Sequence, residues 1–255
     1  MTKSTYPKAE KYPDLETIYS QCSGPGGLKL AEFLAEKINL VPGKRVLDVG
    51  MNRGYQSCFL AKEYGINLVG IDPWTDRKDN RPHVDHLTEN AISWGVEDLV
   101  LGLQVGVPDT RFASSSFDYV YSTTALEMIR GTKGEDAYRD STKEIHRVLR
   151  PDGLFALGEP MHLDVEPAPL ILDLIQQGEE DWTKFFVTIG ETVSVIQSVG
   201  FEIIESGYVT DAHSWWLEYA TYDPYCRNDP NGEAKTIKMD AGSWLSFGYV
   251  IARKK

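Results

Sequence analysis

The feature that most constrains the fold is a strand, a tight turn, a helix and a second strand in close succession. The apolar run Val-Leu-Asp-Val-Gly occupies residues 46–50 and is followed by a short turn that ends at Gly54. Residues 54–64 then show helical spacing, and a second apolar run over residues 66–72 ends in Asp72. A sharp turn from strand into helix needs glycine, which tolerates a positive φ. The pattern predicts two parallel strands joined by a helix.

The same alternation continues along the chain. Helices are expected at residues 27–39, 54–64, 83–95, 134–149 and 189–199, and strands at 44–50, 66–72, 99–105, 117–122, 154–158, 201–209 and 244–252. Strands that alternate with helices form a parallel sheet covered on both faces. Because no strong helical crossover separates the last two strands, they are expected to pair antiparallel. We therefore predict an α/β fold with a Rossmann-like seven-stranded sheet, mostly parallel, whose last strand is antiparallel.

Composition and charge exclude several classes of protein. Of the 255 residues, 42% are apolar, which allows a sizeable core, but no apolar run approaches the ~20 residues of a membrane span. The N-terminus has no apolar signal core, so a cytoplasmic protein without a membrane partner is expected. A net charge of −12 argues against a nucleic-acid partner. Three scattered cysteines, without CxxC or HExxH spacing, indicate neither a disulfide framework nor a metal site.

The chain divides into an arm and one domain. Residues 1–26 are expected to form an N-terminal arm or lid, and residues 27–255 the domain itself. Insertions near 160–186 and 210–243 interrupt the regular alternation. Both lie near the carboxyl ends of strands, where open α/β sheets bind their ligands. We therefore expect the two insertions to form a lid over a substrate.

The turn after the first strand is typical of a nucleotide site. Gly50 and Gly54 let a ligand approach the backbone, and the helix that follows points free N–H groups at it. Asp72, at the end of the second strand, offers a carboxylate for both ribose hydroxyls. This arrangement fits adenosine-containing cofactors. Three interpretations compete: NAD, whose pattern wants glycines where this chain has Asn52 and Tyr55, a purely structural turn, and S-adenosylmethionine.

Several segments together resemble the motifs of class I S-adenosylmethionine-dependent methyltransferases. Val-Leu-Asp-Val-Gly with Gly54 resembles the first motif of that family, and Val-Gly-Ile-Asp at residues 69–72 resembles the second. Three further segments resemble later motifs of the family: residues 115–122, 144–153 and 200–204. The matches follow the family order over about residues 40–210. The resemblance implies methyl transfer from S-adenosylmethionine to a small molecule.

The resemblance also implies which residues bind the cofactor. Those positions are Asp48, Gly50, Asn52, Gly54, Asp72 and Ser122. The two glycines would border the methionine part, Asp48 would lie beneath it, Asp72 would bind the ribose, and Ser122 would face the cofactor through its backbone. Apart from the resemblance, Trp74 comes just after Asp72, so we expect it to contribute a wall or stack on adenine. Asn52 departs from the usual middle glycine of the family, but asparagine tolerates a left-handed backbone.

Upstream, residues 19–27 resemble the N-terminal segment of small-molecule methyltransferases, including phosphoethanolamine and sterol types. That segment folds over the cofactor in the family, which makes Tyr19 a cofactor-side residue here. The alternative is a flexible loop that joins the arm to the first helix.

The acceptor side is less specific. Candidate catalytic residues are Glu159, His162 and His213, and candidate substrate-binding residues are Glu127, Trp215 and Tyr219. The aromatic side chains of the second insertion have helical spacing, so they form either an amphipathic helix packed on the sheet or a pocket. With acids nearby, such a pocket favours a cationic amine through cation–π contact.

Other functions stay open at this point. The acceptor could instead be a thiol, a metalloid or carbon, since Cys22 and Cys226 could meet at the lid and bind a soft metalloid. A further alternative is a module that binds S-adenosylmethionine without catalysis. No metal cofactor is expected, and the sequence leaves the oligomeric state open.

Overall fold

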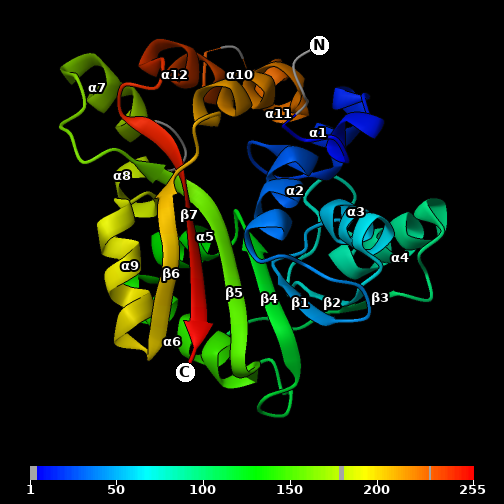
Figure 1. Cartoon of the computed structure of the whole chain (residues 1–255). Helices are drawn as coiled ribbons and strands as arrows, with labels where there is room; N and C mark the ends of the chain where they lie inside the picture. Colours follow the sequence, from blue (N-terminus) through cyan, green and yellow to red (C-terminus); the bar gives the residue numbers. More distant parts are fainter. Residues whose placement is uncertain (1–4, 178–180, 230) are drawn as a thin grey trace.

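A computed structural model describes residues 5–177, 181–229 and 231–255. Its centre is a seven-stranded sheet in the order β3-β2-β1-β4-β5-β7-β6 (Figure 1). The strands are β1 Arg45–Val49, β2 Asn67–Ile71, β3 Val100–Leu103, β4 Phe117–Thr123, β5 Leu149–His162, β6 Phe201–Tyr208 and β7 Leu245–Lys254. Only β7 runs antiparallel to its neighbours, β5 and β6. The predicted fold class is confirmed.

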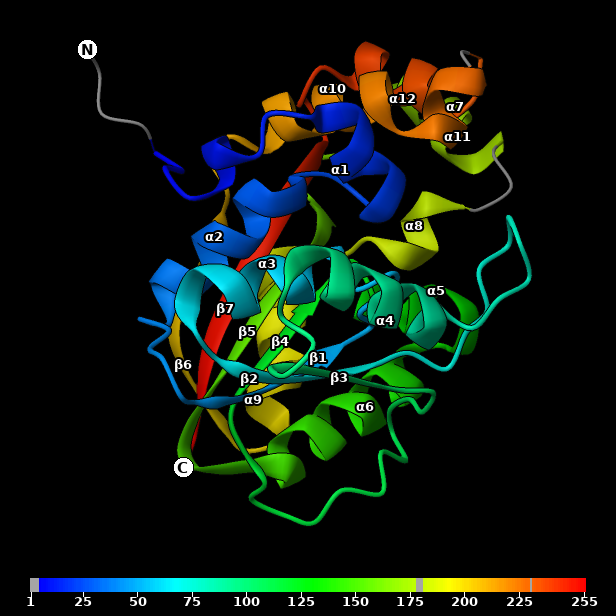
Figure 2. The same ribbon diagram turned by 90° about the vertical axis from the view of Figure 1, so that its right-hand side faces the viewer.

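Helices cover both faces of the sheet and its upper end. They are η1 Ala9–Lys11, α1 Leu15–Gln21, α2 Gly27–Lys37, α3 Tyr55–Tyr64, α4 His83–Trp94, α5 Leu126–Lys133, α6 Glu135–Val148, α7 Pro169–Gln177, α8 Trp182–Phe185, α9 Ile189–Ser198, α10 Ala212–Tyr222, α11 Pro224–Asn228 and α12 Glu233–Asp240. Helices α2, α3 and α4 pack on one face, and α5, α6 and α9 on the other (Figure 2). Within the described residues, no helix combines the length and apolarity that a bilayer span needs.

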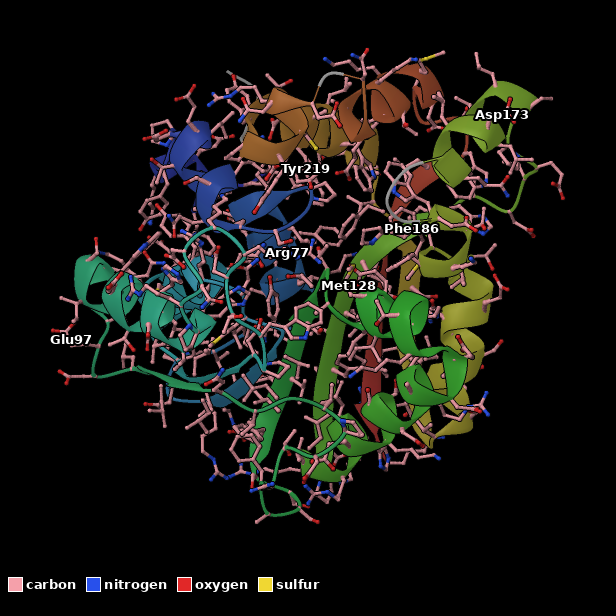
Figure 3. The ribbon with its side chains drawn as sticks, turned by 180° about the vertical axis from the view of Figure 1, so that it is seen from behind. Arg77, Glu97, Met128, Asp173, Phe186 and Tyr219 are labelled. Carbon is pink, nitrogen blue, oxygen red and sulfur yellow. The ribbon has the colours of Figure 1, made fainter. Side chains whose placement is uncertain are left out.

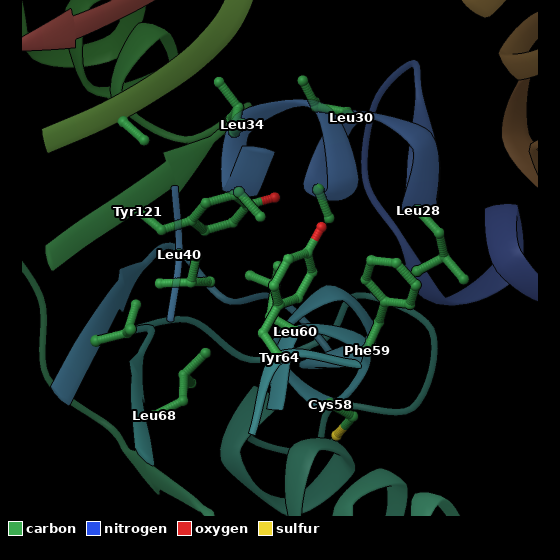
Figure 4. Packing of buried hydrophobic residues seen from close by; sticks show 14 of the residues in the cluster. Leu28, Leu30, Leu34, Leu40, Cys58, Phe59, Leu60, Tyr64, Leu68 and Tyr121 are labelled. Carbon is green, nitrogen blue, oxygen red and sulfur yellow. The ribbon is translucent and has the colours of Figure 1, made fainter. Parts of the chain in front are cut away.

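Leucines and aromatic side chains fill the core between the sheet and α2 and α3. Leu30, Leu34 and Leu60 are fully buried there, together with Phe59 (Figure 4). A helix whose apolar residues recur every three to four positions buries one face in this way. This packing fixes the start of α3, and with it the turn after β1, against the sheet.

One predicted strand near the centre of the chain was too short, and one helix was not predicted. A strand was expected at 154–158, but β5 begins at Leu149 and runs to His162. Leu149 pairs with Phe117, and a shift of register before Tyr119 accommodates the extra residues. Helix α5 was not predicted, because it is short and carries a glycine, Gly131, where helical spacing would be read.

The two insertions lie at the upper end of the sheet. The first carries α7 and α8, and the second carries α10, α11 and α12. Figure 1 shows these helices, together with α1, above the carboxyl ends of the parallel strands. We call α1, α10 and α11 the roof.

Candidate functional site

The turn after β1 is held in left-handed backbone conformations. Its φ values are 81° at Gly50, 50° at Asn52 and 72° at Gly54. A Cβ on Gly54 would lie 2.3 Å from Leu87, so α4 packs directly against the turn. Because α3 begins at Tyr55, its first N–H groups point back at this turn. The turn can therefore present backbone donors to a ligand.

Asp72 lies beside this turn, immediately after β2. Its carboxylate is 3% exposed and accepts hydrogen bonds from the N–H groups of Asn52 (3.0 Å) and Trp74 (2.9 Å). His83 Nδ1 lies 3.1 Å from Oδ2 without hydrogen-bond alignment. A carboxylate has about four lone-pair positions, so two backbone donors leave acceptor capacity for hydroxyl groups. The residues present fit the ribose of an adenosine cofactor.

Asp48 and Ser122 lie beneath the turn and tie it to the sheet. Asp48 is buried and accepts a hydrogen bond from the Ser57 hydroxyl at 2.5 Å. Burial, opposed by the Ser57 hydrogen bond and reinforced by the nearby charge of Asp72, raises the pKa of Asp48 to about 7. The Ser122 hydroxyl donates to the Val49 carbonyl at 2.9 Å, which joins β4 to β1. Trp74, by contrast, is 47% exposed.

The N-terminal segment and the second insertion contact each other above the site. The Tyr19 ring is buried, stacks on Tyr222 with planes 12° apart, and its hydroxyl donates to Glu218 at 3.3 Å. Lys29 forms a 2.5 Å ion pair with the same carboxylate. Arg227 of α11 pairs with Glu16 of α1 at 3.2 Å. The structure thus brings Tyr19 into the roof, between α1 and α10.

Two carboxyl groups are buried where β4 and β5 end. Glu159 is fully buried, and its Oε1 accepts from the Arg130 guanidinium (3.3 Å), the Tyr138 hydroxyl (3.0 Å) and the Thr192 hydroxyl (3.5 Å). Glu127, in the first turn of α5, is 1% exposed. The N–H groups of Ala125 and of Glu127 itself face its carboxyl group, but neither carboxyl oxygen has a well-aligned hydrogen bond among the described residues. Their side chains influence each other electrostatically.

The charges in this cluster do not balance. Burial, followed by the charge of Glu159, holds the pKa of Glu127 well above its usual range. Burial also raises the pKa of Glu159, although Arg130 and Tyr138 oppose this shift. A single guanidinium, that of Arg130, faces both carboxyls, and it also pairs with Glu135 at 2.9 Å. Both shifts favour the protonated form of these carboxyls, and the shift is larger for Glu127, which lacks the Arg130 and Tyr138 hydrogen bonds of Glu159.

The remaining acceptor-side candidates are not brought into this cluster. The His162 ring stacks on Trp244 at 4.7 Å, and its Nδ1 contacts the Leu163 carbonyl at 2.7 Å. His213 is exposed on α10, beside Gly242. Trp215 is 1% exposed and belongs to the core between α2 and β7.

Tyr219 lies elsewhere on α10, in contact with the rings of Tyr19 and Trp216. Seen from behind, Tyr219, Arg77, Met128 and Phe186 lie around the region between the roof and the sheet (Figure 3).

The cysteines are free thiols in buried positions. Cys22 packs in the cluster around α2, whereas Cys226 packs in the separate cluster around α10 and α12 and donates to Glu233 at 3.3 Å. Across the described ranges, no group of three or more His, Cys, Asp or Glu side chains has the arrangement of a metal site.

Sequence reasoning missed two residues that organise the site. Arg130 was not named because the helix that carries it was not predicted. Gln56 was not named because a single glutamine has no motif, yet its amide bonds to three other residues near the turn. Its place two residues after Gly54 was the one available signal.

Comparison with known proteins supports the predicted family. Residues 47–157 match the family model described as "Methyltransferase domain". This match supports a class I S-adenosylmethionine-dependent methyltransferase. The chain is 26% identical over 190 residues to the sterol 24-C-methyltransferase erg6 of Schizosaccharomyces pombe, and this match covers 70% of this chain and 45% of that protein. It spans about half the length of the curated relatives it matches.

Solved structures share the fold of the methyltransferase. The [4+2]-cyclase SpnF has a TM-score of 0.73 at 17% identity, over 98% of this chain and 94% of that one. Phosphoethanolamine N-methyltransferase 2 of Haemonchus contortus, solved with S-adenosyl-L-methionine, has a TM-score of 0.72 at 18% identity, over 99% and 60%. At these identities the likeness concerns the fold.

Proposed function

We propose that the methyltransferase transfers the methyl group of S-adenosylmethionine to a small-molecule amine. The observation that carries the donor side is the Asp72 carboxylate beside the glycine turn, 3.0 Å from the N–H of Asn52. When bound, S-adenosylmethionine supplies a methyl group already activated on a sulfonium. The protein therefore has to orient the reactants and exclude water.

The contacts described above support the following proposed roles in cofactor binding. Asp72 accepts from the ribose hydroxyls with the lone pairs that its backbone donors leave free. Gly50, Asn52 and Gly54 form the floor of the proposed cofactor site. Further cofactor-side positions are Tyr19 in the roof, Asp48 and Ser122 beneath the turn, and Trp74 at the rim.

The acceptor is inferred from the unbalanced carboxyls. A buried acid without a hydrogen-bond partner is costly when charged, unless a cation accompanies it. An ammonium group beside Glu127 would provide that cation and let the carboxyl ionise. We propose Glu127 as the residue that binds the amine. Glu159, whose Oε2 has no hydrogen-bond partner within the described ranges, is proposed as the acceptor of its proton. Contacts with the amine from His162, His213, Trp215 and Tyr219 stay predictions.

A carbon acceptor is the second candidate, because curated relatives of this chain are sterol 24-C-methyltransferases. The exclusion of nucleic acid rests on the net charge of −12 and stays a prediction, as does a cytoplasmic location.

Two measurements test the proposal in order. Isothermal titration calorimetry with S-adenosylhomocysteine should show binding, and the absence of any heat of binding would end the proposal. Release of S-adenosylhomocysteine is then measured with ethanolamine, phosphoethanolamine, a thiol, arsenite and a sterol as acceptors. We expect turnover with an amine, and its loss in Glu127→Gln. Turnover with the sterol or the thiol alone would show that this compound, and not an amine, is the methyl acceptor. Tight binding of S-adenosylhomocysteine without turnover of any acceptor would favour a binding module without catalysis.

A further inference from the structure

Gln56 joins three parts of the molecule that meet beside the glycine turn. It belongs to the first turn of α3, two residues after Gly54. Its Nε2 donates to the carbonyl of Gly27, the first residue of α2, at 2.7 Å. Its Oε1 accepts from the hydroxyls of Tyr121 (3.0 Å) and Thr123 (2.8 Å), both on β4. One amide therefore links α3, the end of β4 and the start of α2.

The segment that Gln56 holds, residues 24–27, is pressed between the roof and the sheet. A Cβ on Gly24 would lie 2.5 Å from Thr124 Cγ2, just beyond β4. A Cβ on Gly26 would lie 2.8 Å from Trp215 Cε3 on α10. The segment thus passes between α10 and the end of β4, and the Gln56 amide is its polar attachment to the start of α3.

The chemistry of these contacts requires an amide. The Gly27 carbonyl can only accept, so it needs the NH₂ group, while the two hydroxyls donate to the oxygen. A glutamate of the same size would place a carboxylate against the Gly27 carbonyl and lose that donor. A methionine of similar size would lose all three hydrogen bonds. Substitution can therefore separate the polar link from the volume of the side chain.

We propose that Gln56 is a positioning residue that holds residues 24–27 closed over the bound cofactor and slows its release. The inference rests on the proposed cofactor site, because the turn beside Gln56 is the floor of that site. Tyr121 and Thr123 act through Gln56 by fixing the orientation of its amide. Loss of the link should leave the floor itself in place and mainly affect how long the cofactor stays.

The test is the dissociation rate of S-adenosylhomocysteine, followed by stopped-flow tryptophan fluorescence. In Gln56→Glu and Gln56→Met, this rate should rise about tenfold, the effect of roughly one or two hydrogen bonds. Tyr121→Phe and Thr123→Val should each raise it less. Tyr119→Phe is the matched control, since Tyr119 lies on the same strand without a hydrogen bond to Gln56, and should leave the rate unchanged.

Thermal unfolding of each free variant separates positioning from stability. A lower midpoint of unfolding with an unchanged dissociation rate in all four variants would overturn the inference, because Gln56 would then only stabilise the fold. If Gln56→Glu does not fold, the Tyr121 and Thr123 variants decide the question by the same readout. Failure of the wild-type chain to bind S-adenosylhomocysteine would remove the proposed function itself, and this inference with it.

Discussion

Gly50 and Ala125 are so close that a Cβ atom on Gly50 would lie 2.2 Å from the Cβ of Ala125. Ala125 immediately precedes α5, so the turn after β1 and the start of α5 are in direct contact. Gly43 has a similar φ of 75°, compared with 81° at Gly50, but a Cβ there would meet nothing within 4 Å. Substituting alanine at each of these two glycines therefore separates the energetic cost of a positive φ from the cost of a steric collision.

Gly50→Ala should destabilise the protein more than Gly43→Ala does. The control should lose about 1–2 kcal/mol from its left-handed backbone alone. Gly50→Ala adds a collision of about 1–3 kcal/mol and moves α5 away from the turn. Chemical denaturation measures both variants, and equal losses would show that the contact with Ala125 relaxes without cost.

Asp72→Ala should weaken S-adenosylhomocysteine binding by about 2–4 kcal/mol, because hydrogen bonds to a charged carboxylate are lost. Calorimetry gives the affinity, and thermal unfolding reports the additional loss of the contacts with Asn52 and Trp74. Asp85→Ala, an exposed acid on α4, is the control and should bind normally. Unchanged affinity in Asp72→Ala would show that this carboxylate is not at the cofactor.

Asp48→Asn should change how stability depends on pH. Burial raises the folded-state pKa of Asp48 from 3.8 to about 7, so between these values the folded state binds more protons than the unfolded state. The free energy of unfolding of the wild type therefore falls as pH rises through this window, by up to roughly 4 kcal/mol from this group. Asparagine does not titrate. Urea unfolding at pH 4 and pH 7 gives the free energy of unfolding of both proteins. Relative to the wild type, the variant should be more stable at pH 7 than at pH 4. The same difference between the two proteins at both pH values would contradict this.

Arg130→Met should destabilise the protein by about 3–5 kcal/mol near pH 7, because it leaves Glu159 and Glu127 without their shared cation. The loss should be smaller near pH 5. The pKa values of both carboxyls are already raised, so at lower pH they are protonated and need no cation. Arg111→Met, whose ion pair with Asp109 is exposed, is the control. A pH-independent loss would indicate that Arg130 contributes through packing on Tyr138 alone.

That the glycine turn and Asp72 lie side by side could be predicted, because their contacts are between segments close in sequence. The turn from Gly50 to Gly54 and the acid at Asp72 belong to consecutive elements, and parallel pairing of β1 with β2 places their ends side by side. Backbone geometry alone thus brings these residues together. No comparable rule sets the direction of a side chain such as Trp74, which lies half exposed at the rim.

The acceptor side depends on packing between distant segments, which sequence patterns do not reveal. The spacing of Trp215 and Tyr219 predicted a helix, but not that Trp215 enters the core. The His162 ring stacks on Trp244. Trp244 directly precedes β7, so the two rings meet only because β7 pairs with β5. Glu159 directly follows the strand predicted at 154–158 and lies inside the longer β5, whereas its partner Arg130 lies on a helix with no clear sequence signal.

The ion pair between Glu16 and Arg227 joins segments from opposite ends of the chain. During synthesis, residues 45–72 leave the ribosome early and can form their strands while the rest is still being made. The roof above them cannot be completed until α10 and α11 have left the ribosome. A nascent chain therefore acquires a place for the nucleoside long before it can enclose one, so ligand added during translation should protect only nearly finished chains from proteolysis.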